Sequence, residues 1–520
     1  MAEPHREQKM IRVGLARCRP GYDGLRAPWG PGKAYPELLR LLGSAAADGP
    51  ANEVYAAVRS ALHGLGLDAD RFGTSDWNPI GALVPSGKRI VLKPNLIRHW
   101  NPRQQAGSAG DGRGGTVDSV ITHGAIIRAV ADYAMIAAGP EGSVAIAEAP
   151  QMDCDFDEIR RITGLDEIAS VYDETLSRTL EVIDLRREAV IFRDGIIDQR
   201  KTLPGDPAGY RAVDLGDQSF FTGSGLDPNR FRGADYDPGP TTDHHSGGRN
   251  AYLLSETVLS ADLVINLPKL KTHKKTGVTL ALKNLVGING DKNWLPHHSL
   301  GSVAEGGDEF PTNRLIDRLR SRATEIARPL LAKGKGLKLF QMARRVETAA
   351  RGDQFIRSGN WYGNRTTWRM CCDLNRCLYY SDRDGLHLEA SGPVRTVLTI
   401  IDGVLAGEGE GPLAPVDVPL GAVIAGTDPV AVDLAAVRLM GFDENKLEKL
   451  AGPMRDEGPR ITGVRSSADV ELGEVAAGSD AVVDRRLGEL AVEGHLFEPH
   501  AGWVGRIERD PRSSRVGVSG

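Results

Sequence analysis

Four lysines and a histidine are concentrated in residues 269–275, which read KLKTHKK. An apolar run at 263–267, typical of a buried strand, precedes them, and Val278, Leu282 and Leu285 follow at helical spacing. In open α/β sheets, ligands bind where the carboxyl end of a strand faces a helix N-terminus, and the helix amides there favour an anion. The lysines strengthen that preference, so we predict an anion-binding junction that could also be catalytic.

Within this run, Lys269 and Lys271 alternate with Leu270. Alternate side chains of an extended segment leave the same face, so both ammonium groups should lie together at the end of the strand. Lys283 and Asn284 then interrupt an apolar helical pattern, where polar side chains are disfavoured unless they face a cavity or a partner. The alternative interpretation of the whole run is an ordinary solvated turn.

A second polar strand end follows the predicted strand at 89–92. Pro94 holds Lys93 in extended geometry and ends the hydrogen-bonded pairing of the strand. Lys93 and Asn95 should therefore lie at the carboxyl end of the strand. A helix is expected at 125–139. A contact of Lys93 or Asn95 with a ligand and a merely polar strand end both fit this pattern.

Thr122 is a candidate N-cap of that helix, and His123 follows it. With a further apolar strand at 144–147, the order strand, helix, strand predicts a βαβ unit of a parallel sheet. Asp402 follows another apolar strand later in the chain, and Asp428 precedes Pro429 as an N-cap would. A cap at the mouth of a strand can also face a ligand.

These positions predict an enzyme for a small carboxylate or phosphate, because lysine carries a point charge and burial can lower its pKa towards general-base duty. The candidate catalytic residues are Lys271, His273 and His123. The candidate substrate-binding residues are Lys93, Asn95, Lys269, Lys283, Asn284, Asp402 and Asp428. The alternative function is that of a non-catalytic binding protein for an anionic metabolite or a protein partner.

A divalent metal is a second option, because two histidine pairs flank the central run. Asp243, His245 and His298 are the candidate ligands, chosen from the acids and histidines near both pairs. Their spacing matches no standard zinc motif, and ordinary loop histidines are the competing interpretation. Three of the five cysteines cluster at 371–377, but their spacing is not the iron–sulfur run of a ferredoxin.

Composition limits the partners and the compartment. A net charge of −5 and 6% aromatic residues argue against a nucleic-acid partner. The sequence shows no apolar run long enough for a transmembrane segment, and an odd number of cysteines without a framework suits a reducing compartment. We therefore expect a cytoplasmic protein, and the sequence does not predict its oligomeric state.

The predicted fold class is α/β, a mostly parallel sheet with helices on both faces and large loop and helical insertions. We expect an N-terminal helical and loop segment at 1–88 and an α/β core at 89–460. Within the core, insertions are expected at about 151–258 and 290–390. Residues 461–520 should supply a closing edge and a flexible tail.

Several short motifs resemble the domain of unknown function 362 family. The matching pieces are LKPN at 92–95, TH at 122–123, NLPKLKTH at 266–273, LKN at 282–284, Gly287, DG at 402–403 and DPVAVD at 428–433. The resemblance implies an α/β domain and no particular activity. Some members carry an appended iron–sulfur ferredoxin module, whose cysteine run this chain lacks.

Overall fold

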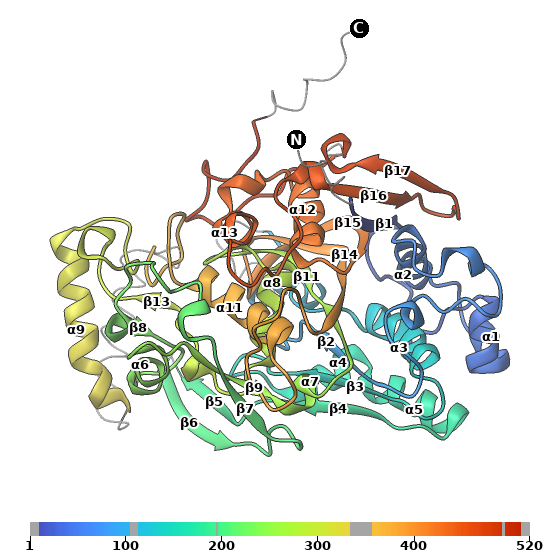
Figure 1. Cartoon of the computed structure of the whole chain (residues 1–520), viewed down its shortest axis with the longest axis horizontal. Coiled ribbons are helices and arrows are strands. Elements are labelled where there is room, and N and C mark those ends of the chain that lie inside the picture. The colour runs from blue at the N-terminus through green and yellow to red at the C-terminus, as the bar shows by residue number, and fades with distance from the viewer. Residues whose placement is uncertain (1–9, 105–112, 194–195, 333–355, 491–493, 511–520) are drawn as a thin grey trace, which may run out of the picture.

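A large mixed sheet of eleven strands forms the centre of the molecule (Figure 1). The computed structural model describes residues 10–104, 113–193, 196–332, 356–490 and 494–510. Along the sheet the strands are β17 (Val482–Arg486), β16 (Val470–Val475), β1 (Ile11–Arg17), β15 (Ala414–Gly426), β14 (Thr396–Glu410), β10 (Leu263–Leu267), β2 (Arg89–Pro94), β3 (Ser143–Glu148) and β4 (Leu180–Asp184). Past Pro268, β11 (Lys269–His273) continues beside β14 and pairs with β12 (Gly277–Val278).

Most neighbouring strands of this sheet run parallel. β14, β10, β2, β3 and β4 form one parallel block, and β1 pairs in parallel with β16. The antiparallel pairs are β14 with β15, β15 with β1, β16 with β17, and β11 with β12. The mostly parallel α/β sheet expected from the sequence is confirmed.

Helices cover both faces of the sheet. On one face, α2 (Glu53–Gly64) and α3 (Gly124–Ala138) share an apolar cluster with Leu263 and Ile265 of β10. On the other face, Val264 packs in a cluster with α11 (Thr367–Tyr380). Successive strand residues thus point to opposite cores, as the two-residue period requires. The remaining helices are α1 (Pro36–Leu42), α4 (Phe156–Thr163), α5 (Leu165–Leu176), α6 (Gly239–His245), α7 (Glu256–Leu259), α8 (Leu280–Asn284), α9 (Leu315–Ala332), α12 (Pro429–Leu439) and α13 (Glu448–Arg455).

Three small two-stranded sheets lie outside the main sheet, on the side of the molecule that also carries α9 (Figure 1). They pair β5 (Glu188–Arg193) with β6 (Ile196–Thr202), β7 (Tyr210–Asp214) with β9 (Ala251–Ser255), and β8 (Phe231–Arg232) with β13 (His298–Ser299). They fall within the segments expected as insertions, although β4 from the first of these segments joins the main sheet.

The main sheet crosses the segment boundaries expected at 88 and 460. β1 lies in the N-terminal segment, for which only helices and loops were expected, yet it pairs with β15 and β16 inside the sheet. β16 and β17, which belong to the segment 461–520, lie at one edge of the sheet. Part of the flexible tail expected there, at 491–493 and 511–520, lies outside the described residues. Among the helices of the described ranges, none combines the length and hydropathy that membrane crossing requires.

Candidate functional site

A cavity of about 400 Å³ opens at the carboxyl ends of β2, β3 and β11. This edge of a parallel sheet is where α/β proteins place their ligands. Its lining includes the polar residues Asn95, Glu148, Gln151, His273, Lys274, Lys275, Thr279, Lys283, Asn284, Lys292, His297, His298, Ser358 and Thr367. The lining thus contains four lysines and one carboxylate.

Five of the residues singled out from the sequence line this cavity, namely Asn95, His273, Lys283, Asn284 and His298. Lys93 lies directly behind the wall. It is fully buried, forms an ion pair with Glu148, and donates to Pro94 O at 2.7 Å and Asn284 Oδ1 at 3.3 Å. Lys93 thus neutralises the one lining carboxylate and is not free to hold a ligand.

Gly287 lets Lys93 and Glu148 approach each other at the cavity wall. A Cβ atom on this residue would lie 2.0 Å from Glu148 Oε1 and 2.5 Å from Lys93 Nζ. No side chain fits such a space without displacing the pair. Gly287 O also accepts the amide of Ala149 at 2.8 Å, which ties the segment after α8 to the end of β3.

Lys269, His123 and Asp402 meet in a second polar cluster, which is buried and separate from the lining of the cavity. Lys269 Nζ lies 2.9 Å from Asp402 Oδ2, and the hydroxyl of Tyr22 donates to Asp402 Oδ1 at 2.5 Å. The backbone amide of His123 donates to Asp402 Oδ2 at 3.0 Å, and its ring stacks on Tyr22. Asp402 already supplies the anion that Lys269 was expected to bind.

His123 is the N-cap of α3. Its Nδ1 accepts the amide of Ala125 at 3.1 Å, and burial lowers the pKa of the ring to about 3. Asp428 has the matching role at α12, where its carboxylate accepts the amides of Val430 and Ala431 at 2.9 and 3.0 Å. Neither residue lines the cavity, so both have the structural role that capping predicts.

Lys271 is also buried behind the cavity rather than exposed in it. Its ammonium nitrogen donates to the carbonyls of Val120 and Pro412, and Pro412 itself lines the cavity. Burial and the nearby Lys269 and Lys283 hold the pKa of Lys271 well below its ordinary value. Lys271 supports the wall between the two polar clusters.

The three candidate metal ligands do not come together. Asp243 is exposed on α6, whereas His245 is buried, and its Nε2 donates to Trp294 O at 2.7 Å. His298 lines the cavity instead. Across the ranges that the structure describes, no group of three or more His, Cys, Asp or Glu side chains is arranged to hold a metal ion.

An internal carboxylate occupies the N-terminus of α8, the helix that carries Lys283. Asp433 accepts the amides of Ala281 at 2.6 Å and Leu282 at 3.3 Å, and Lys449 lies 3.2 Å from the same carboxylate. The helix amides that were expected to attract a ligand are therefore already satisfied. Leu280 begins this helix at φ +52°, a conformation that is unfavourable for a side chain and that recurs near functional sites.

The four lining lysines differ in their contacts. Lys275 Nζ donates to His297 O at 2.9 Å and Ser358 O at 2.5 Å, and Lys292 Nζ donates to Ala149 O at 2.8 Å and Val286 O at 3.2 Å. Burial lowers the pKa of each of these two lysines to about 7. Both can therefore change charge near neutral pH.

Lys283 and Lys274 make no such contacts. Within the described ranges, neither ammonium group forms a hydrogen bond or an ion pair with another residue. Burial lowers the pKa of both, and Lys449 lowers that of Lys283 further, whereas Glu410 raises that of Lys274. These are the two cations of the cavity that a ligand could reach without breaking an existing contact.

Two histidines that line the cavity differ in the hydrogen-bonding role of their Nε2 atoms. Nδ1 of His273 accepts the amides of Lys275 at 3.0 Å and Thr276 at 3.2 Å, so the neutral ring carries its proton on Nε2. Nδ1 of His297 instead donates to Leu295 O at 2.9 Å, which leaves its Nε2 as an acceptor. Burial is the main cause that holds the pKa of His273 well below its ordinary value and lowers that of His297 to about 3.

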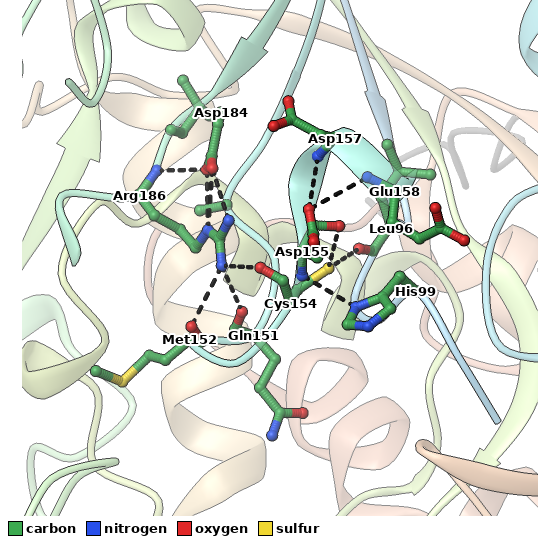
Figure 2. Close-up of polar contacts among 12 residues, drawn as sticks. Leu96, His99, Gln151, Met152, Cys154, Asp155, Asp157, Glu158, Asp184 and Arg186 are labelled. Atoms are coloured by element: carbon green, nitrogen blue, oxygen red, sulfur yellow. Dashed lines mark hydrogen bonds and ion pairs between the residues drawn. The ribbon is translucent and has the colours of Figure 1, made fainter. Parts of the chain in front are cut away.

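The guanidinium of Arg186 fixes the loop that forms another wall of the cavity (Figure 2). It donates to Gln151 O at 2.9 Å and Cys154 O at 2.8 Å, and it pairs with Asp184 at 2.7 Å. Asp155 then caps α4 by accepting two amides of its first turn. The loop after β3 is held at both ends, which keeps Gln151 and Met152 against the cavity.

Several residues that shape the cavity were not selected from the sequence. They are Glu148, Lys274, Lys275, Lys292, His297, Asp433 and Lys449. Lys274 and Lys275 belong to the basic run at 269–275, and Glu148 follows a predicted strand. These positions in the sequence could have indicated all three as site residues. Lys292 and Lys449 did not, because only the folded chain brings them to the cavity or to α8.

The fold and the cavity define an α/β protein with a lysine-rich site at the carboxyl ends of parallel strands. A family model described as Domain of unknown function (DUF362) matches residues 204–438, and this is the family that the sequence motifs resemble. The match includes the basic run, α8 and Asp433, whereas Asn95 and Glu148 lie before it. No curated protein and no solved structure matches the chain.

Proposed function

We propose that the protein is an enzyme that acts on a small carboxylate or phosphate bound in this cavity. The observation that carries the proposal is Lys283, a residue that is only 9% exposed and whose ammonium group forms no ion pair with a carboxylate of the described residues. Burying a charge without a counter-charge is costly, and an anionic ligand would remove that cost. The one lining carboxylate, Glu148, is already paired with Lys93.

The surrounding groups suit acid–base chemistry on such a ligand. Lys283 and Lys274 would hold its negative charge, and Nε2–H of His273 would donate to one of its oxygen atoms. Lys275 and Lys292, with pKa values of about 7, are suited to proton transfer at neutral pH, because general catalysis works best with a pKa near the operating pH.

Thermal unfolding with simple anions tests the binding step. Sulfate, phosphate and oxalate, each compared with chloride at constant ionic strength, should raise the Tm of the intact protein. A ligand at about 100 times its Kd stabilises the folded state by about 2.7 kcal/mol. Lys283→Gln should abolish the shift, and Lys201→Gln, a change to an exposed lysine of β6, should preserve it. Equal shifts in both variants, or no shift with any anion, would refute the proposal.

We also propose a cytoplasmic location. All five cysteines of the chain are free thiols, and four of them are buried. Reduced cysteines without disulfides are typical of a reducing compartment. Cell fractionation with an antibody to the protein tests this, and recovery from a secreted or periplasmic fraction would refute it.

A further inference from the structure

The buried lysines around the cavity differ in whether their ammonium groups are already engaged. Lys93 is paired with Glu148, and Lys275 and Lys292 each donate to two backbone carbonyls. Lys283 is different, because it lines the cavity and its Nζ makes no hydrogen bond or ion pair to any residue of the described ranges. Its conversion from ammonium to free amine would therefore break no contact.

The backbone that carries Lys283 is held on both sides. Before it, Asp433 binds the amides at the start of α8. After it, the side-chain amide of Asn284 donates to Asn266 Oδ1 at 2.8 Å and to Lys93 O at 3.2 Å. A reactive group on a rigid element is held in a productive geometry without further loss of entropy.

Burial of Lys283 favours the free amine. Burial and the positive charge of Lys449 lower its pKa, and only Cys371 and Glu148 oppose them. Desolvation beside other cations is a known way to make a lysine nucleophilic. Lys274, at the other side of the basic run, lies near Glu410, whose charge favours its ammonium form.

We propose that Lys283 is a nucleophile that forms an imine with the carbonyl group of a small oxo acid. This inference rests on the proposed anion site, with Lys274 as the counter-charge for the carboxylate. The lone pair of Nζ adds to the carbonyl carbon, and the π electrons of the C=O bond move to the oxygen. Both amine protons then leave with that oxygen as water, while the C–O bond breaks and a C=N bond forms. No electron donor or acceptor is needed.

Reductive trapping of the full-length protein tests this step. Glyoxylate, the smallest acid with an aldehyde group, is added with cyanoborohydride at neutral pH, and peptide mass mapping locates the carboxymethylated lysines. Lys283 should react at least about tenfold faster than the exposed Lys201, since each unit by which a pKa falls raises the free-amine fraction about tenfold. Oxalate should slow labelling at Lys283 and leave Lys201 unaffected.

The Lys283→Arg variant separates this inference from the proposed function. Arginine keeps the positive charge but cannot form the imine, so the rise of Tm with oxalate should persist while the label is lost. If oxalate stabilises the wild type but Lys283 reacts no faster than Lys201, the imine is refuted and anion binding stands. If oxalate neither stabilises the wild type nor slows labelling, the anion site itself is refuted.

Discussion

The ammonium of Lys449 lies 3.2 Å from a carboxylate oxygen of Asp433, and neither side chain is exposed. Lys449 also donates to Val278 O and Thr279 O, while Asp433 binds two amides of α8. The pair therefore fixes the backbone on both sides of Leu280 and sets the position of Lys283.

Removal of Asp433 should destabilise the protein strongly. Asp433→Ala removes the carboxylate that neutralises the buried charge of Lys449, and such a loss costs about 3–5 kcal/mol. Urea unfolding measures the change. The double variant Asp433→Ala/Lys449→Met should recover part of the loss because it removes the unpaired charge.

A surface ion pair provides the comparison for this measurement. Glu448 and Arg455 lie 2.7 Å apart, with side chains about half exposed. Exposed pairs contribute about 0–1 kcal/mol, so Glu448→Ala should have a small effect. Similar losses of stability for Asp433→Ala and Glu448→Ala would contradict the role assigned to the buried pair.

Gly287→Ala should disrupt the cavity wall. The added methyl group would overlap Glu148 and Lys93, so the ion pair must separate, and overpacking of this kind typically costs about 1–3 kcal/mol. Gly392→Ala is the matched control, because a Cβ there meets nothing within 4 Å. Urea unfolding compares the stabilities of the two variants. Unchanged stability in Gly287→Ala would show that the cavity wall accommodates the added methyl group without loss.

The site could be predicted in part because its central run is local in sequence. Lys283 and Asn284 interrupt an apolar pattern, which indicated a cavity, and both line it. The alternation of Lys269 and Lys271 with Leu270 indicated that both lysines lie on the same face of the strand. It did not indicate which residues surround that face. Because β11 continues beside β14 beyond Pro268, that face lies inside the protein and meets Asp402 and backbone carbonyls.

The sheet was predictable where neighbouring strands are close in the chain. β2, α3 and β3 follow the βαβ order expected from the sequence. β1 was missed because it carries no such local context, and its partners β15 and β16 lie near the other end of the chain. Pairings at such separation depend on the whole fold rather than on a local pattern.

His245 should make the stability depend on pH. Burial is the main cause that lowers its folded-state pKa to about 4, below the ordinary value of 6.5. Between these two values the unfolded chain binds a proton that the folded chain does not. The contribution of His245 to the free energy of unfolding is therefore fully present above pH 6.5. Between pH 6.5 and about 4 it falls on acidification, by about 1.4 kcal/mol per pH unit.

Urea unfolding at several pH values between 7.5 and 4.5 measures that slope. His245→Gln keeps an N–H donor for Trp294 O but cannot titrate, so the slope should become shallower by one proton whatever its effect on absolute stability. Lys201→Gln serves as the control and should leave the slope unchanged. An identical slope in His245→Gln and wild type would contradict the assignment.

Sulfate affinity should weaken as the pH rises above 7. Lys275 and Lys292, with pKa values of about 7, lose their charge there, while sulfate remains a dianion. Each lysine that couples to the anion can reduce affinity by up to about tenfold per pH unit. Calorimetric titration of wild type and Lys275→Met tests this, with a shallower dependence expected in the variant. Affinity that rises with pH would contradict it.

The pairing of β1 also bears on the order in which the protein can fold during synthesis. Ile11–Arg17 leaves the ribosome before the other strands of the main sheet, yet its strand partners are Ala414–Gly426 and Val470–Val475. Until these two segments emerge, the backbone amides and carbonyls of β1 have no partner strand and must be satisfied by water or by a chaperone. β2 and β3, by contrast, can pair as soon as Glu148 has emerged. β1 therefore joins the sheet only after most of the chain has been synthesised.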